Sequence, residues 1–192
     1  MKKIQLYLYA ILSGLLLSLA WLPHDLTPLI FIAFVPLLIV ENAIYKNPEQ
    51  HKALTLFICS YLTFFTWNLI TTWWLKNASL GGAAMAIFCN ALLMCIPIQL
   101  FHNTKKRIGE NWGYVLFVCF WLAFEHIHFD WELSYPWLTL GNVFAENINW
   151  VQWYEYTGVF GGTLWILLVN VLFFKVQSST SKIKSLIVPL AI

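Results

Sequence analysis

The sequence predicts an all-α fold: a polytopic transmembrane helical bundle with six complete spans, the start of a seventh, and an aromatic-rich outer interfacial segment. Two observations lead to this prediction. Apolar residues make up 60% of the 192 residues and charged residues 10%, whereas soluble domains hold roughly half and about a quarter. Six stretches are also apolar for about 20 residues each, which is the length that a helix needs to cross a hydrocarbon core. We therefore expect a protein that lies in a membrane.

The spans are separated by loop-forming residues such as Asn47-Pro48 and Gly81-Gly82. The first stretch follows two lysines, as in a signal peptide, but it is long and no A-x-A cleavage site closes it, so we expect a retained span. A last apolar run from Ser185 to Ile192 would make about 12 Å of helix, which predicts a truncated seventh span. The six complete spans are expected at 4–22, 26–45, 53–75, 82–101, 112–128 and 158–176.

Basic residues indicate the orientation of the bundle. Ten of the eleven Lys and Arg residues fall on one side of the expected spans, and only Lys76 falls on the other. Lys and Arg are strongly biased to cytoplasmic loops. The pattern therefore predicts a cytoplasmic amino terminus and places the segment 129–157 on the outer side.

Other functional classes find little support. The net charge is only +2 and the basic residues are scattered, so we expect no nucleic-acid partner. The four cysteines, Cys59, Cys89, Cys95 and Cys119, lie in apolar runs and are expected to be small buried side chains. We find no metal-ligand spacing, no phosphate loop and no catalytic motif. The chain is therefore expected to hold no catalytic residue, metal or cofactor.

The segment 129–157 is the most unusual part of the chain, with nine aromatic residues, four acids and no Lys or Arg. Phe144, Ile148, Val151 and Glu155 recur at helical spacing, which predicts a short interfacial helix. One interpretation is an aromatic belt that fixes the depth of the protein in the membrane. The other is a wall of a lipid-substrate site, formed with Trp131, Trp137 and Trp150.

Polar residues within the spans are the other candidates. Trp121, Glu125 and His128 share a helix face, and Glu125 is either a functional group or a structural hydrogen-bonding group. Glu41 lies at the cytoplasmic end of its span, where we expect it to reach water. A polar stripe on the third span and a Gly158–Gly162 pair are expected to pack against other helices. The stripe consists of Ser60, Thr63, Asn68 and Thr71.

A set of motifs resembles the membrane part of the apolipoprotein N-acyltransferase family. The set is Trp121, Glu125, His128 and Trp131, the run Tyr135-Pro136-Trp137-Leu138-Thr139-Leu140-Gly141-Asn142, and Trp150, Gln152, Gly158 to Gly162, Trp165 and Asn170. Earlier features agree, including a Pro23-His24-Asp25 turn and Phe34 to Leu38. The resemblance covers essentially the whole chain. Many members carry Arg where this chain has His128, so the ion pair with Glu125 is not expected here.

The resemblance implies a multi-pass protein of the bacterial inner membrane and an enzyme that acts on lipids. The full enzyme would take an acyl chain from a phospholipid, form a thioester on a cysteine, and pass it to the N-terminal Cys of a diacylglyceryl lipoprotein. Its Glu-Lys-Cys triad would lie in a nitrilase-like domain after the seventh span, and none of the three is assigned here. Glu125, His128, Trp131, Trp137 and Trp150 would bind lipid.

Two other functions stay open from the sequence: a non-catalytic membrane scaffold and a small transporter. A transporter would be expected to have polar or broken spans near the membrane midplane. The polar stripe on the third span is mild for that role.

Overall fold

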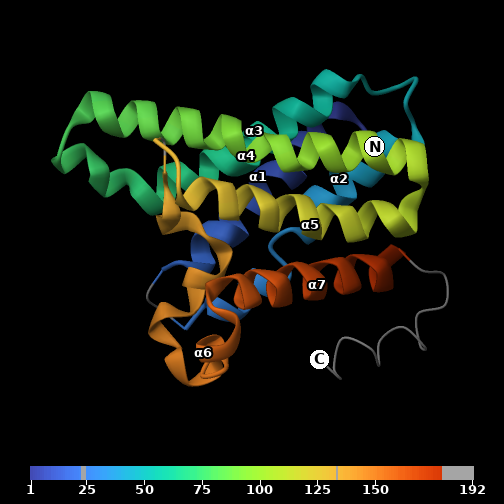
Figure 1. The fold of residues 1–192 in the computed structure, drawn as a ribbon. Helices are drawn as coiled ribbons and strands as arrows, with labels where there is room; N and C mark the ends of the chain where they lie inside the picture. The colour runs from blue at the N-terminus through green and yellow to red at the C-terminus, as the bar shows by residue number, and fades with distance from the viewer. Residues whose placement is uncertain (23–24, 133, 179–192) are drawn as a thin grey trace.

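The fold is a bundle of helices, described by a computed structural model for residues 1–22, 25–132 and 134–178 (Figure 1). Within these residues six elements are long and apolar enough to cross a membrane, which confirms the predicted helical bundle. They are α1 (Lys3–Ala20), η1 (Thr27–Phe31) together with α2 (Val35–Lys46), α3 (Ala53–Thr72) with η2 (Trp73–Asn77), α4 (Leu80–Ile108), α5 (Glu110–Phe129) and α7 (Val159–Ser178). The seventh span predicted at 185–192 and residues 23 and 24 of the predicted turn lie outside the described residues.

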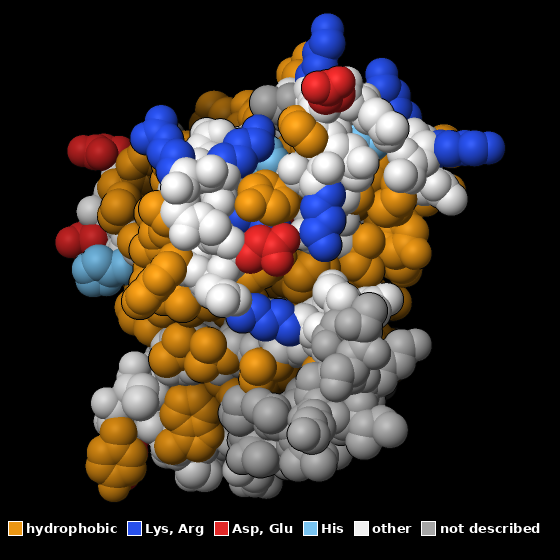
Figure 2. All heavy atoms as spheres, turned by 90° about the vertical axis from the view of Figure 1, so that its right-hand side faces the viewer, with side chains coloured by type: hydrophobic (Ala, Val, Ile, Leu, Met, Phe, Trp, Pro, Cys, Tyr) orange, Lys and Arg blue, Asp and Glu red, His pale blue; other side chains and the backbone are white. Residues whose placement is uncertain are grey.

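The two ends of the bundle differ in chemistry. Seven exposed basic residues lie at the end where α1 begins and where α4 turns into α5, which we call the basic end: Lys2, Lys3, Lys46, Lys52, Lys106, Arg107 and Lys175. Figure 2 looks onto this end and shows Lys and Arg side chains spread across it. The opposite end, which we call the aromatic end, holds residues 129–157 between α5 and α7.

The helix α4 is longer than predicted. The expected span ended at Phe101, but the helix continues through Lys105 to Ile108 and stops at Gly109, whose φ of 88° few other residues adopt. The basic residues that were predicted to form a loop therefore occupy the last turns of a helix.

This extension buries a charged cluster and overturns the expectation that Glu41 reaches water. Glu41 is only 1% exposed and Lys105 is fully buried. The Glu41 carboxyl pairs with Lys105 Nζ at 2.7 Å and with His102 Nδ1 at 2.8 Å, and Lys105 also donates to Tyr114 Oη at 3.0 Å. Burying one charge without its partner is costly, so these residues tie α2, α4 and α5 together as a unit.

The second span is broken, although the sequence predicted one continuous helix over 26–45. It divides into η1 and α2, and Pro36 stands in the first turn of α2. Proline has no N–H to donate and its ring clashes with the turn before it, so Pro36 fits in the first turn of α2 but not in the interior of a helix that continues from η1. The break leaves backbone groups without helical partners, and hydrocarbon offers none.

The side chain of Asn170 on α7 supplies the missing partners. Its Oδ1 accepts from the Phe34 backbone N–H at 2.8 Å, and its Nδ2 donates to the carbonyl oxygens of Ile30 at 2.8 Å and Ile166 at 2.9 Å. On the other side, Ser13 of α1 donates to the carbonyl oxygen of Ala33 at 2.5 Å. The break is thus closed by two neighbouring helices.

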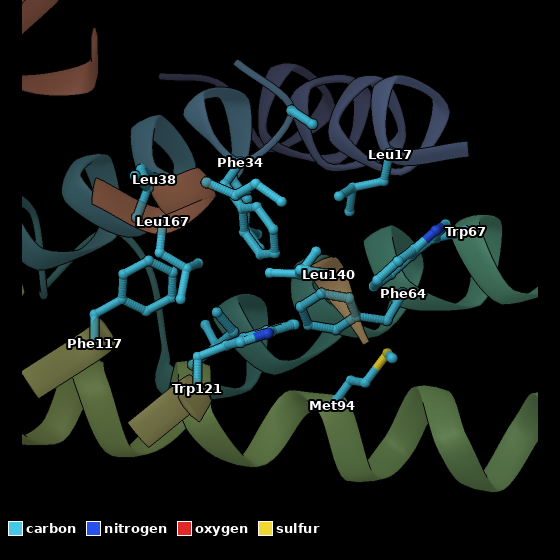
Figure 3. Packing of buried hydrophobic residues seen from close by; sticks show 14 of the residues in the cluster. Leu17, Phe34, Leu38, Phe64, Trp67, Met94, Phe117, Trp121, Leu140 and Leu167 are labelled. Carbon is cyan, nitrogen blue, oxygen red and sulfur yellow. The ribbon is translucent and has the colours of Figure 1, made fainter. Parts of the chain in front are cut away.

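Phe34, beside the break, joins an aromatic cluster at the centre of the bundle (Figure 3). Its ring lies 4.9 Å from that of Trp121 and 6.4 Å from that of Phe64, centroid to centroid. Leu140 of the segment 129–157 is fully buried and reaches into the same cluster. The core therefore joins α2, α3, α5 and the aromatic end.

The polar stripe on α3 serves helix packing at two of its four positions. Thr63 donates to the Ala10 carbonyl oxygen of α1 at 2.8 Å, and the Asn68 side chain accepts from Asn90 of α4 at 2.8 Å. Ser60 and Thr71 donate to carbonyl oxygens of their own helix. The interhelical interpretation is therefore right for Thr63 and Asn68.

The prediction of four buried cysteines is half right. Cys59 and Cys95 are buried, but Cys89 and Cys119 are exposed on the outer surface of their helices. In a membrane protein the outer surface is as apolar as the core, so an apolar run does not tell the two apart.

We predict that Asn170→Leu lowers the free energy of unfolding by about 2 kcal/mol or more, because it leaves the buried N–H of Phe34 unpaired and removes one donor from the Ile30 carbonyl. Reversible unfolding in mixed micelles, followed by circular dichroism, measures the effect. Asn149→Leu is the matched control, since Asn149 is exposed and outside the spans. Equal stability of the two variants would contradict the role given to Asn170.

Candidate functional site

The segment 129–157 folds as short turns rather than as the interfacial helix expected over 144–155. It contains η3 (Pro136–Leu138), η4 (Leu140–Glu146), η5 (Ile148–Trp150) and the four-residue α6 (Tyr154–Thr157). Phe144 and Val151 are buried, whereas Ile148 and Glu155 are exposed, so the four residues share no face. The helical spacing was therefore misleading, because 3₁₀ turns place side chains differently from an α-helix.

Glu125 of α5 anchors this segment. Its Oε1 accepts from the Trp121 indole N–H at 2.9 Å and from the Leu140 backbone N–H at 2.9 Å, and its Oε2 accepts from the Thr163 hydroxyl at 2.7 Å. The side chain is 4% exposed. Three donors from three parts of the chain thus satisfy one carboxyl and hold the aromatic end against α5 and α7.

Gly141 extends the same network. Its N–H donates to the Thr163 hydroxyl oxygen at 3.1 Å, and its carbonyl accepts from Tyr154 Oη at 2.9 Å. Burial, and to a smaller extent the Glu125 carboxyl, raises the pKa of Tyr154 to about 12, so this hydroxyl keeps the proton that it donates. A Cβ on Gly141 would collide with the backbone oxygen of Val159, so only glycine fits this contact.

The Gly158–Gly162 pair does not form the expected helix–helix contact. Nothing lies within 4 Å of a Cβ built on Gly158, and a Cβ on Gly162 would meet the hydroxyl of Tyr154. Gly162 therefore makes room for the tyrosine that holds Gly141.

A second polar chain runs from α3 through α4 to α5. Asn68 Nδ2 donates to the Phe64 carbonyl oxygen at 2.8 Å, Asn90 Nδ2 donates to Asn68 Oδ1 at 2.8 Å, and His128 Nε2 lies 2.9 Å from Asn90 Oδ1. A carbonyl oxygen only accepts, so the first bond fixes the orientation of both amides. His128 Nε2 must then donate, and in the neutral imidazole Nδ1 is left as an acceptor.

Two adjoining cavities lie along the seam between α4 and α5, which we call the α4–α5 groove. The first has a volume of about 320 Å³ and includes Cys89, Asn90 and Tyr135 in its lining. The second has a volume of about 270 Å³ and includes Pro97 and Trp131. Leu93 and His128 line both cavities.

The five residues predicted to bind lipid fall into three groups. His128 and Trp131 lie together at the α4–α5 groove, with ring centroids 5.4 Å apart. Glu125 is occupied by internal hydrogen bonds. Trp137 is exposed and packs edge-on against Trp74 and Tyr135, while Trp150 is exposed beside Phe144. The structure thus does not gather all five at one place.

Sequence reasoning gave no role of their own to four residues of this site, although Tyr135 stood in the motif run 135–142. Asn90, Thr163, Tyr154 and Tyr135 bond to or stand beside the predicted residues. A polar side chain facing inward in an apolar span is a functional candidate by default, and this rule would have found Asn90 and Thr163. Tyr154 and Tyr135 were hidden among many aromatic residues.

The arrangement offers binding and positioning rather than covalent chemistry. Cys89 lines the cavity that Asn90 and His128 also line, yet among the described residues no hydrogen bond joins its Sγ to either side chain. No group of three metal-ligating side chains occurs within the described residues either. A nucleophile needs a base within hydrogen-bond reach, so Cys89 is not activated in this geometry.

The family is decided by comparison with known proteins. A family model described as the apolipoprotein N-acyltransferase N-terminal domain matches residues 13–172, which include the whole of the aromatic end. The chain belongs to the apolipoprotein N-acyltransferase family.

Three curated relatives carry the same name. The apolipoprotein N-acyltransferase of Chlorobaculum tepidum is 32% identical over 84% of this chain and 30% of its own length. Those of Geobacter metallireducens and Haemophilus influenzae are 29% and 27% identical, over 88% and 100% of this chain and 33% and 36% of their own lengths. The chain thus spans about a third of the length of these relatives. No solved structure matches it significantly.

The motifs on which the resemblance to the apolipoprotein N-acyltransferases rested now have physical roles. Trp121, Glu125 and Leu140 form one hydrogen-bonded unit, Gly141 and Gly162 meet the same tyrosine, and Asn170 closes the broken span. These motif residues therefore fix where the aromatic end sits.

We predict that Gly141→Ala loosens the aromatic end, because the added methyl group must displace Val159. Overpacking of this kind typically costs about 1–3 kcal/mol. Hydrogen exchange followed by mass spectrometry should show faster exchange in residues 136–157 and little change in α1. Gly81→Ala is the control, since a Cβ there meets nothing within 4 Å. Unchanged exchange in Gly141→Ala would show that the close contact of Gly141 with Val159 does not hold the aromatic end.

Proposed function

We propose that this chain is the membrane part of an apolipoprotein N-acyltransferase. The enzyme would transfer an acyl chain from a phospholipid to the N-terminal Cys of a diacylglyceryl lipoprotein, a step of lipoprotein maturation. The observation that carries the proposal is the family match over residues 13–172, which spans the aromatic end and most of the helical bundle. Within that match, the hydrogen bonds of Glu125 connect the motif residues and hold the aromatic end in a fixed position at one end of the bundle.

We place the protein in the bacterial inner membrane with its amino terminus in the cytoplasm. The support is the gathering of exposed Lys and Arg at the basic end (Figure 2), because such residues favour the cytoplasmic side. The aromatic end then faces outward. Exposed Trp137, Trp150 and Tyr156 would lie in the headgroup layer, where aromatic side chains are enriched.

The chemistry of the proposed reaction has two steps. A thiolate attacks the ester carbonyl of the phospholipid, forming a thioester and a lysophospholipid alkoxide that takes up a proton. The amino group of the lipoprotein Cys then attacks the thioester, loses a proton, and forms an amide as the thiol is released. We assign none of these catalytic groups to this chain. Its part is to hold two lipid-linked reactants at one depth.

The five candidate residues take different parts in this proposal. His128, Trp131, Trp137 and Trp150 would contact lipid, since each either lines the α4–α5 groove or is exposed at the aromatic end. Glu125 would be a positioning residue, because its hydrogen bonds all go to groups of the chain itself.

A transporter is less well supported, although broken spans are typical of transporter binding sites. The second span is broken, but Asn170 and Ser13 occupy its free backbone groups. These groups are therefore not available to coordinate a transported solute.

We predict that the complete reading frame that contains this sequence adds a third acyl chain to a diacylated lipopeptide. A phospholipid with deuterated acyl chains serves as donor, so mass spectrometry of the product identifies the source of the added chain. The chain of 192 residues alone should give no product. A product from this length alone, or none from the complete protein, would overturn the proposal and leave a scaffold or transporter role.

We also predict that Trp137→Leu with Trp150→Leu lowers the rate of the complete enzyme at limiting phospholipid. Both indoles are exposed, so the bundle should remain folded while the lipid contact is lost. Phe173→Leu is the control, because Phe173 is exposed on α7, away from the aromatic end. Unchanged use of the lipid donor by the double variant would assign the two indoles to the aromatic belt only.

A further inference from the structure

The α4–α5 groove has the dimensions of an acyl-chain site. Its lining on α4 extends from Met85 to Leu100, a rise of about 22 Å along the helix axis, of which the second cavity, from Leu93 to Leu100, takes about 10 Å. One leaflet of a hydrocarbon core is only about 15 Å thick. Met85, Leu100 and Ile127 of the lining are exposed, so the groove opens on the surface that faces lipid.

The second cavity has a polar end, where it joins the first cavity at His128, and is apolar along the rest. His128 and Trp131 stand where α5 reaches the aromatic end, whereas Ile96, Pro97 and Leu100 continue toward the basic end. Pro97 has no N–H, so the carbonyl of Leu93 lacks its usual helical donor within the groove wall. This order of polar and apolar groups matches that of a membrane lipid.

Three buried polar atoms of the groove lining have no hydrogen-bond partner among the described residues. They are Nδ1 of His128, whose side chain is 96% buried, Nε1 of Trp131, and Oη of Tyr135, which as a hydroxyl can donate or accept. The chain Asn68–Asn90–His128 makes Nδ1 an acceptor, as argued above, and the indole N–H is a donor. Buried polar groups are normally paired, so these atoms call for a ligand that offers both a donor and an acceptor.

We propose that the α4–α5 groove binds one acyl chain of a glycerophospholipid whose polar part carries an O–H or N–H donor. The acyl chain of the lipid lies along Leu93, Pro97 and Leu100. An ester or phosphate oxygen of the lipid accepts from the Trp131 indole N–H, and the lipid headgroup donates to Nδ1 of His128. Water alone fits less well, because it would find no partners along the apolar length of the groove. The assignment rests on the proposed function for one point only, that this lipid is the acyl donor.

The first experiment locates the acyl chain of the bound lipid. The protein is placed in nanodiscs with phosphatidylglycerol that carries a diazirine on one acyl chain, and the labelled residues are mapped by mass spectrometry after illumination. We expect labelling of Ile96, Leu100 and Ile127 above that of Leu8 and Leu15, which are exposed on α1. Equal labelling at both sets would mean ordinary boundary lipid and would overturn the proposal.

Filling the groove provides the matched pair of variants. Ala123→Trp places an indole in the second cavity, and Ala84→Trp places one on an exposed position of α4 outside the two linings. Ala123→Trp should reduce labelling of Ile96 and Leu100 to the level of Leu8, whereas Ala84→Trp should leave it unchanged. Since Ala123 is exposed, the variant is expected to fold; circular dichroism and gel filtration confirm this before labelling.

The second experiment tests the polar end by comparing phosphatidylglycerol with phosphatidylcholine, whose headgroup has no O–H or N–H. The wild-type protein should prefer phosphatidylglycerol by about fivefold, the factor that one net hydrogen bond provides. His128→Phe keeps a ring beside Phe124 and should lose this preference but retain chain labelling. His126→Phe is the control, because His126 is exposed and contacts Phe160 instead.

Neither experiment requires acyl transfer, so the two proposals fail separately. If Ala123→Trp labels like the wild-type protein while the complete enzyme still adds an acyl chain, the groove assignment falls and the function stands. If the groove binds lipid as described but the complete protein gives no acylated product, the function falls and the lipid site stands.

Discussion

The structure depends on how a backbone break inside hydrocarbon is repaired. Pro36 interrupts the second span, and the side chain of Asn170 accepts from the Phe34 N–H that the break leaves free and donates to the Ile30 carbonyl. That repair holds Phe34 at the centre of the bundle, against the Trp121 ring. Trp121 in turn donates to Glu125, which fixes the segment 129–157. A single amide on α7 is therefore connected, through packing and hydrogen bonds, to the position of the aromatic end.

Hydropathy was enough to predict the helical bundle, but it did not reveal how the helices interact. The core and the lipid are equally apolar, so nothing in the runs around Cys89 or Cys119 said that these side chains face outward. Glu41 was expected to reach water because it lies at the cytoplasmic end of its span, and its partner Lys105 fell outside the predicted spans. The helix α4 instead continues through Lys105, and the resulting ion pair is long-range in sequence. Local patterns do not report such contacts.

The aromatic end shows a second limit of sequence reasoning. Composition correctly singled out residues 129–157 as unusual, yet it did not separate side chains that enter the core, such as Leu140 and Phe144, from those that stay exposed, such as Trp137 and Trp150. A 3.6-residue period over Phe144 and Ile148 arose in 3₁₀ turns, where it has no structural meaning. The Glu125 network decides which residues turn inward. Two of the three donors to Glu125 lie 15 and 38 positions away along the chain.

The two polar networks at this end differ in one physical respect, and that difference separates scaffold from site. Both carboxyl oxygens of Glu125 accept hydrogen bonds, and all three donors come from the polypeptide itself, so the carboxyl holds its surroundings in one arrangement. In the series of hydrogen bonds Asn68–Asn90–His128 every donor points in the same direction, toward Phe64. The series ends at Nδ1 of His128, an acceptor with no partner among the described residues. A buried atom that already has a hydrogen-bond partner gains little from a ligand, whereas a buried atom without one gains a hydrogen bond. Ligand binding is therefore expected beside His128 rather than at Glu125, although the carboxylate is the more conspicuous residue in the sequence.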